Sequence, residues 1–210
     1  MTFSIIAIDK ENGECGFAVA SCTPNVGKKV GSAEPNIGVF CTQCVSKPQW
    51  REKVIKSLQD NIPVSSIMND LIQNDDAPED RQLAIIDMNG NNINHDPSQS
   101  EARHYSGSYT GTNFSCQGNR LVNKNVIDKM VNVMENESGS LVDKMMKALL
   151  AGDKEGGDKK GRLSAGIKVV SNNSPQPIFE DYVFLNGCAV QTLYNKYIEN
   201  QSWIGEHDFQ

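Results

Sequence analysis

The sequence predicts an α+β fold, a four-layer α/β/β/α sandwich in which two antiparallel sheets stack face to face with helices outside. Three observations lead to this prediction. Strand-like apolar runs alternate along the chain with pairs of amphipathic helical stripes. Polar, glycine-bearing turns join neighbouring strands, which indicates hairpins. The helices come in pairs, which argues against alternating βαβ units. At 210 residues, the chain suits a single domain over residues 1–210.

The first half of the chain opens with a hairpin. Strands are expected over 2–9 and 15–21, around a polar turn at 10–14 that contains glycine. A loop with two lysines follows, and a strand is expected over 37–43. Two helical stripes begin at Trp50 and, behind Pro63, at Val64, because apolar residues recur there at helical spacing.

The second half repeats this order of strands and helix pairs. Asn89-Gly90 is a strong hairpin turn signal between two further strands. The polar region 96–112, rich in Gly, Ser and Tyr, is expected to be a loop. The remaining elements are strands at 82–88, 92–95, 113–117, 163–171 and 182–185, and helices at 126–134, 141–150 and 189–200.

Charge and hydropathy exclude two classes of partner. The net charge is −6, and no run of Lys or Arg is long enough for a nucleic-acid footprint. No segment approaches the roughly 18 apolar residues of a membrane-spanning helix, and we see no secretory signal. The expectation is a cytoplasmic protein that binds a small-molecule substrate or ligand, with no nucleic-acid or membrane partner. A homo-oligomer is compatible with the sequence.

The six cysteines allow two interpretations. Cys41 and Cys44 form a C-x-x-C pair that, with Cys15 and Cys22, would make a zinc site. However, structural zinc sites usually contain paired knuckles, and no second C-x-x-C follows. Buried, reduced thiols that pack as small apolar side chains are therefore favoured. We predict no metal site and no cofactor.

Thr2 begins the first strand directly after the initiator Met1. If Met1 is removed, Thr2 carries a hydroxyl nucleophile and an α-amine base on one residue. An α-amine titrates at roughly 8, so it can accept the hydroxyl proton without a histidine. The alternative is an ordinary strand that happens to begin beside the initiator.

Five separated motifs together resemble the bacterial and archaeal protein family DUF1028. The resemblance runs from residue 2 to about 170 and implies the Ntn-hydrolase (N-terminal nucleophile) fold, without settling a substrate or reaction. The motifs are Thr2-Phe3-Ser4-Ile5, Ala18-Val19-Ala20-Ser21, Arg81-Gln82, Gln117-Gly118-Asn119 and the stretch 156–165.

The Ntn resemblance implies roles for several residues. Thr2 matches the nucleophile position, and Asp158 and Ser164 resemble the Asp and Ser that support the amine in proteasome-like enzymes. Those enzymes also carry an acid at the end of the second strand and a lysine just beyond it. Here the strand ends in Ser21, which is not an acid, and neither Lys28 nor Lys29 is clearly in register.

Substrate and oxyanion contacts are expected at strand ends that face Thr2, because acyl transfer needs donors for the developing oxyanion. Gln43 and Cys44 end one strand, and Gln117, Gly118 and Asn119 end another. Glutamines at the ends of apolar strands require hydrogen-bond partners in a core. The alternative for Gly118-Asn119 is a turn in which Asn caps the next helix.

Two arginines complete the candidate site. Arg162 belongs to a glycine-rich loop that crowds polar groups before a strand, and such a loop is either functional or a plain connector. Arg81 suits bidentate binding of a substrate carboxylate. Its alternative is a salt bridge to Glu79 or Asp80. The histidines His95 and His104 lie in polar stretches and are expected at the surface.

The sequence thus favours an Ntn-type hydrolase that acts on an amide or related C–N bond of a small molecule. The rival is a non-catalytic or ligand-binding member of the same fold that has lost the nucleophile. Two features favour the rival: Ser21 in place of an acid, and the segment after Asp181, where relatives carry an acidic, His-containing stretch.

Overall fold

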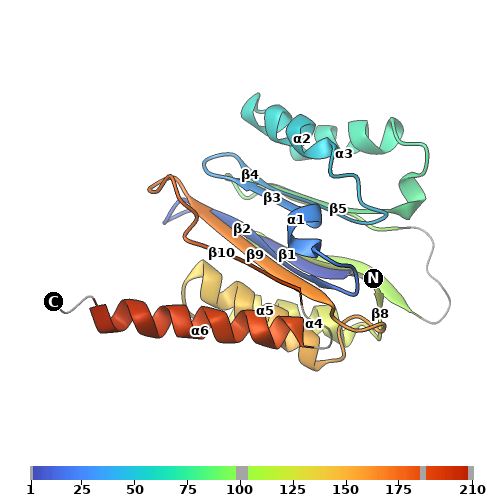
Figure 1. The fold of residues 1–210 in the computed structure, drawn as a ribbon. Coiled ribbons are helices and arrows are strands. Elements are labelled where there is room, and N and C mark those ends of the chain that lie inside the picture. The colour runs from blue at the N-terminus through green and yellow to red at the C-terminus, as the bar shows by residue number, and fades with distance from the viewer. Residues whose placement is uncertain (1, 98–103, 185–187, 208–210) are drawn as a thin grey trace.

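The computed structural model describes residues 2–97, 104–184 and 188–207 and has the expected four layers. Helices α2 and α3 cover one sheet, the second sheet stacks beneath it, and α4, α5 and α6 cover the far side (Figure 1). Met1 lies outside the described residues. So do residues 185–187, which belong to the divergent segment after Asp181. The two-sheet α+β sandwich predicted from the sequence is confirmed.

The first sheet has six strands in the order β10-β9-β2-β1-β8-β7, and every neighbouring pair is antiparallel. The amino-terminal hairpin therefore supplies the centre of this sheet. In its register, Thr2 lies between Ser21 on one side and Asn119 on the other. The strands are β1 (Thr2–Asp9), β2 (Glu14–Ser21), β7 (Tyr105–Gly111), β8 (Phe114–Leu121), β9 (Ser164–Ser171) and β10 (Phe179–Phe184).

The second sheet has four antiparallel strands in sequence order, β3-β4-β5-β6. Gln43 of β4 pairs with Gln82 of β5, so two amide side chains lie next to each other on one face. The strands are β3 (Gly31–Glu34), β4 (Gly38–Cys44), β5 (Arg81–Asp87) and β6 (Asn92–His95).

The helices bury amphipathic faces against the sheets. The buried stripes are those expected, such as Met130 of α4 and Met145 of α5, because helical spacing places them on one face. Ser140 caps α5, where its side chain accepts a hydrogen bond from the Asp143 amide. The helices are α1 (Val26–Val30), α2 (Trp50–Gln59), α3 (Val64–Gln73), α4 (Asn125–Asn136), α5 (Leu141–Lys154) and α6 (Ala189–His207).

Three apolar clusters separate the layers. The largest fills the space between the six-stranded sheet and α4, α5 and α6. A second packs the four-stranded sheet against α2 and α3. The third lies between the sheets and contains Ile6, Phe17 and Cys41. This intersheet cluster ends before Thr2 and Ser4, although alternation along β1 puts both on the same face as Ile6.

Three elements differ from the prediction. Tyr105–Gly111 forms β7 instead of part of a loop, and Gly31–Glu34 forms the short strand β3. Val26–Val30, expected in a loop, is the single helical turn α1. β7 is an outer strand and half exposed, so its sequence lacks the apolar alternation of a buried strand.

The end of β8 also corrects a prediction. The strand runs to Leu121, so Asn119 lies inside a sheet, and α4 begins later at Asn125. The alternative in which Asn119 caps the next helix is therefore wrong. His95 belongs to β6, is partly buried, and its Nε2 lies 2.9 Å from the Pro78 carbonyl oxygen. Within the described residues, no helix combines the length and apolarity needed to span a membrane.

Candidate active site

A buried polar network occupies the end of the intersheet layer at which β1 starts. Alternation along each strand directs polar side chains of β1, β2, β8, β4 and β5 into this layer, where the apolar cluster ends. All of them are at most 5% exposed. The set is Thr2, Ser4, Ser21, Gln43, Gln82, Ser115, Gln117 and Asn119.

The amide of Gln82 is the centre of this network. Its Oε1 accepts hydrogen bonds from Gln43 Nε2 at 2.7 Å and from Asn119 Nδ2 at 3.0 Å. Its Nε2 donates to Asp96 Oδ1 at 2.8 Å and to the Gly118 carbonyl at 2.9 Å. Two of these four bonds, with Asn119 and Gly118 of β8, join β5 to the other sheet.

Two amide oxygens in the network accept no hydrogen bond from any described residue. They are Gln117 Oε1 and Asn119 Oδ1, both on β8 and both fully buried. Gln117 Nε2 donates to Ser4 Oγ at 3.3 Å, and Ser4 in turn donates to Gln43 Oε1 at 2.8 Å. A buried acceptor without a donor costs about 1–3 kcal/mol, so these oxygens are suited to N–H or O–H groups of a bound molecule.

Thr2 lies at the border of this network and lines a small cavity. Its Oγ1 is 3.1 Å from Ser21 Oγ, and the residue is 5% exposed. The cavity has a volume of about 50 Å³, and Lys29 of α1 contributes the only charged side chain among its described lining residues. The lining residues are Thr2, Thr23, Val26, Lys29, Val30, Gln43, Cys44 and Ser46.

Asp158 lies beyond the first residue of β1. Its carboxylate accepts hydrogen bonds from the backbone amides of Cys22, at 2.7 Å, and Lys160, at 2.9 Å. Its backbone forms a bridge with Leu121. Cys22 and Leu121 continue the two strands that flank Thr2, so the carboxylate lies across the amino-terminal end of β1.

The carboxylate of Asp158 is buried, with the residue 1% exposed, and it pairs with no Lys or Arg of the described chain. Buried carboxylates are usually paired or heavily hydrogen-bonded. Its field also reaches the neighbouring thiol: burial and the Asp158 charge raise the pKa of Cys22. The site therefore has a fixed negative charge beside the start of β1.

Ser164 fixes the segment that forms the cavity wall. Its Oγ donates to the Thr23 carbonyl at 2.5 Å and accepts from the Val26 amide at 3.0 Å. Ser164 also pairs with Ser21 across β2 and β9. The hydroxyl thus anchors the first residue of α1, and its described contacts position the cavity wall instead of reaching Thr2.

Neither arginine of the predicted site faces Thr2. Arg81 is 5% exposed, and its Nε donates to Asp75 Oδ2 at 2.6 Å. The expected alternative, a bridge to Glu79 or Asp80, is thus replaced by one to Asp75, which lies in the loop just after α3. Arg162 donates to the Gly156 carbonyl at 3.3 Å and forms an ion pair with Asp153 of α5. Both guanidinium groups hold loops in place.

The cysteines do not converge on a metal. Within the described parts of the chain, no group of three or more His, Cys, Asp or Glu side chains is placed to hold a metal ion. Cys15 and Cys41 pack in the intersheet cluster, and burial raises the pKa of each thiol to about 12. They behave as small apolar side chains, as the favoured interpretation predicted.

One protein-family model matches most of this chain. A model described as "Family of unknown function (DUF1028)" matches residues 2–185. The chain belongs to the DUF1028 family. The resemblance drawn from its five motifs is thus confirmed.

A solved structure of another DUF1028 protein is also similar. It is the crystal structure of protein SPO2555 from Silicibacter pomeroyi, with a TM-score of 0.85 and 26% sequence identity. The match covers 94% of this chain and 85% of that one. The comparison with curated proteins found no match. These findings support the two-sheet α+β fold of the DUF1028 protein and assign it no activity.

The residues predicted for this DUF1028 site did not include Ser4, Gln82, Lys29 or Ser21 as the partner of Thr2, although the quoted motifs contain Ser4, Gln82 and Ser21. A usable signal existed for two of them. Ser4 follows Thr2 at the two-residue period of one strand face, and Gln82 is a glutamine inside an apolar strand. The sequence offers Lys29 as a lysine just beyond the second strand but leaves its register open, because its place depends on the turn of α1.

Proposed function

We propose that this protein is an Ntn-type hydrolase in which Thr2, freed by removal of Met1, cleaves an amide or related C–N bond of a small molecule. The observation that carries the proposal is the position of Thr2. Its hydroxyl lines a cavity at the polar end of the intersheet layer, and the Asp158 carboxylate lies across the adjacent strand end. The two-sheet sandwich with its amino-terminal strand at the centre is compatible with the Ntn-like label.

The first chemical step needs a base and a nucleophile. In the proposal, the α-amine of processed Thr2 accepts the proton of Oγ1, which attacks the substrate carbonyl carbon. Gln43 and Cys44 border the cavity and supply N–H groups for the oxyanion. Collapse of the tetrahedral intermediate expels the amine, which takes the proton, and leaves an ester on Thr2. Water then hydrolyses this ester and restores the hydroxyl.

The polar network supplies substrate recognition in this proposal. Gln117 and Asn119 present acceptor oxygens, so they suit N–H groups of the substrate better than an oxyanion. Asn119 pairs with Thr2 in the sheet, with Cβ atoms of such pairs about 4.5–5.5 Å apart. Lys29 adds a positive charge at the other side of the cavity, which favours a substrate that also carries a carboxylate.

A ligand-binding protein without catalysis is the second candidate. The volume of the cavity favours it, because 50 Å³ is little more than the roughly 30 Å³ that one water occupies in the liquid. Ser21 also stands where proteasome-like enzymes carry an acid. In the hydrolase proposal, the carboxylate of Asp158 takes over that role from a different strand end.

Intact mass spectrometry and a panel of small amides test the proposal. The processed protein should lack the mass of Met1 and hydrolyse at least one amide. Thr2→Ala should lower turnover by about 10³-fold or more while the circular dichroism and melting temperature stay near wild type. Thr2→Ser, which keeps a hydroxyl, is the matched control and should retain measurable turnover. Full activity in Thr2→Ala would exclude Thr2 as the nucleophile.

The pH dependence tests the role of Asp158 separately. A carboxylate near an amine favours the ammonium form and so raises the amine pKa. Asp158→Asn should therefore move the acidic limb of the kcat/KM profile to lower pH. A purely structural role would lower activity without moving this limb. An unmoved limb in a folded variant would remove Asp158 from the proposed site.

A further inference from the structure

A second pocket, of about 270 Å³, lies on the opposite side of α1 from Thr2. Lys28 lines this pocket, whereas its neighbour Lys29 lines the Thr2 cavity, so one helical turn separates the two. The other walls come from β3, α2, β9 and β10. Charged side chains supply much of the lining: Lys28, Arg51, Lys168 and Glu180.

Three positive charges in this pocket have no carboxylate partner. Lys28 of α1, Arg51 of α2 and Lys168 of β9 form no ion pair with any described acidic residue. The chain as a whole has 26 acidic and 20 basic residues, so acidic partners are not scarce. Three unpaired cations around one hollow of an acidic protein indicate an anionic ligand.

The guanidinium of Arg51 uses one nitrogen in a hydrogen bond and leaves another, Nε, without an acceptor in the described chain. Its Nη2 donates to the Lys28 carbonyl at 2.8 Å, which ties α2 to α1. Its Nε is buried and donates to no acceptor of the described chain. Burial lowers the pKa of Arg51, because the charged guanidinium loses part of its hydration. An oxyanion at this point would satisfy the buried Nε–H.

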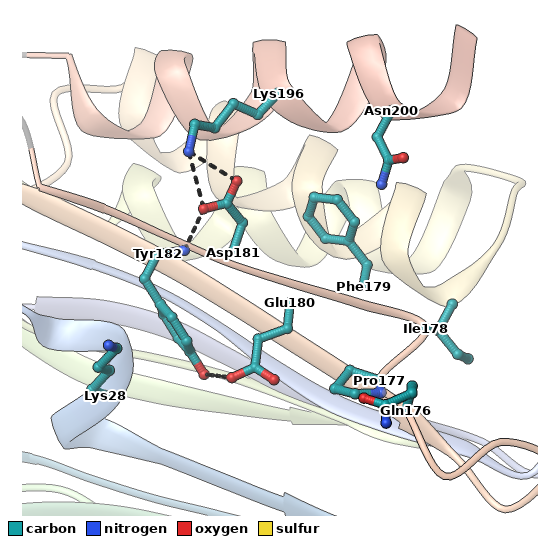
Figure 2. A pocket seen from close by; sticks show the side chains of 10 residues that line it. All are labelled: Lys28, Gln176, Pro177, Ile178, Phe179, Glu180, Asp181, Tyr182, Lys196 and Asn200. Atoms are coloured by element: carbon teal, nitrogen blue, oxygen red, sulfur yellow. Dashed lines mark hydrogen bonds and ion pairs between the residues drawn. The ribbon is translucent and has the colours of Figure 1, made fainter. Parts of the chain in front are cut away.

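Glu180, the acidic residue of the pocket, lies opposite Lys168 in the β9–β10 register, but its carboxylate bonds to Tyr182. Its carboxylate accepts the hydrogen bond of Tyr182 Oη at 2.6 Å, and Lys28 Nζ lies 5.7 Å from the centroid of the Tyr182 ring. Figure 2 shows Glu180 joined to the Tyr182 hydroxyl, with Lys28 across from them. Counting Glu180, the lining keeps two net positive charges, from three cations and one anion.

We propose that this pocket binds the phosphate group of a small molecule. Its three cations come from three different elements, and a tetrahedral phosphate presents oxygens in several directions, whereas a carboxylate presents two in one plane. The guanidinium of Arg51 matches phosphate oxygens as a fork, and the two lysines act as point charges. The site is independent of the hydrolase proposal, because none of these groups faces Thr2.

The neighbouring surface has room for the body of such a ligand. An open groove of about 740 Å³ follows β10, the outer strand of its sheet, and shares Lys28, Glu180 and Tyr182 with the pocket. One end of the groove contains Pro177 and Ile178, and at the other end Lys196 and Asp181 pair above Tyr182 (Figure 2). A phosphate on the three cations would leave the rest of the molecule along this partly apolar groove.

Calorimetric titration with inorganic phosphate, at an ionic strength matched with chloride, tests the proposal. Wild type should bind one phosphate saturably. The double variant Arg51→Gln/Lys168→Gln should bind at least about tenfold more weakly. The single variant Lys168→Gln, whose ammonium forms no ion pair with a described residue, should weaken binding without altering the melting temperature. Absence of saturable phosphate binding by wild type would overturn the proposal.

Two controls separate this pocket from general charge effects. Lys29→Gln removes the same charge from the same helix turn but on the Thr2 side, so phosphate affinity should stay at the wild-type value. Equal weakening in Lys29→Gln and Lys168→Gln would contradict the site. Phenyl phosphate should bind more tightly than inorganic phosphate if the groove holds the body, and equal affinity would overturn the part of the proposal that concerns the groove.

Discussion

Gln82 holds the neighbouring side chains of the buried polar network in position. Its amide is fully buried, accepts from two side chains and donates to the half-buried Asp96 and to the backbone of β8. Such a network stabilises the fold only while each member keeps its partners, because an unpaired buried polar group is costly. The position of Gln82 thus fixes the amides that border Thr2.

We expect Gln82→Leu to lower the free energy of unfolding by about 2–4 kcal/mol. The substitution keeps similar volume but leaves the amide hydrogens of Gln43 and Asn119 and the Oδ1 oxygen of Asp96 without their partner. Urea denaturation measures the loss. Gln59→Leu, at the exposed end of α2, is the matched control and should change stability by less than about 0.5 kcal/mol. Equal effects would contradict the importance of the network.

Asp75 should make stability depend on pH in the acidic range. Burial alone would raise its pKa, but hydrogen bonds and charge from Arg81 and Lys47 outweigh burial and lower the pKa to about 2. Because the folded-state value lies below the unfolded one, the contribution is complete above pH 4 and is lost as pH falls through about 2. Screening limits it to at most about 2 kcal/mol.

Thermal melts between pH 5 and 2 check this expectation. Asp75→Asn should be less stable than wild type at pH 5, because Arg81 loses its partner, and the two melting temperatures should converge towards pH 2. Lys56→Gln provides a control from an exposed pair with Asp60, and its difference from wild type should stay small throughout. A constant gap between wild type and Asp75→Asn would contradict the assigned pKa.

Among the elements, long periodic ones were predictable and short ones were not. The helices at α2 to α5 and the hairpin β1–β2 follow from apolar spacing alone. β7 was missed because its Gly-, Ser- and Tyr-rich sequence is stabilised by pairing with β8, a tertiary effect. The same limit applies to the site: Gln43 and Thr2 meet through sheet stacking, and Arg81 turns to Asp75 through a contact between the loop just after α3 and β5.

The cap of α5 gives a prediction at this scale. Ser140 Oγ accepts from the Asp143 amide at 3.2 Å, so Ser140→Ala leaves that amide without its partner. The expected cost is about 1 kcal/mol, measured by urea denaturation. Ser140→Asp, which keeps an acceptor at the cap, should lose much less. A similar loss for both variants would show that the side-chain bond does not stabilise α5.

In the whole molecule, the intersheet layer has two halves with different physical roles. The half around Phe17 and Cys41 is apolar, and it contributes the hydrophobic stabilisation that holds the sheets together. The half around Thr2 and Gln82 is polar, fully buried and contains unpaired amide oxygens. Unpaired buried polar groups destabilise a fold. We therefore expect the polar half, and not the apolar half, to bind a ligand or substrate.

The cysteines report the opening of these layers. Burial raises the pKa of Cys15 and Cys41 to about 12 and also raises that of Cys116 in the cluster below the first sheet. At pH 8 these three thiols should react with a thiol reagent only when the layers open, about 10³-fold or more slowly than the exposed Cys188. Mass spectrometry of the labelled protein over time separates the two classes of thiol.

The labelling rate of the three buried thiols follows the free energy of unfolding. Gln82→Leu should therefore accelerate their labelling by the factor that its stability loss predicts, while the labelling rate of Cys188 stays unchanged. Rapid labelling of all three buried thiols in a protein with native circular dichroism would contradict the closed packing of the two sheets.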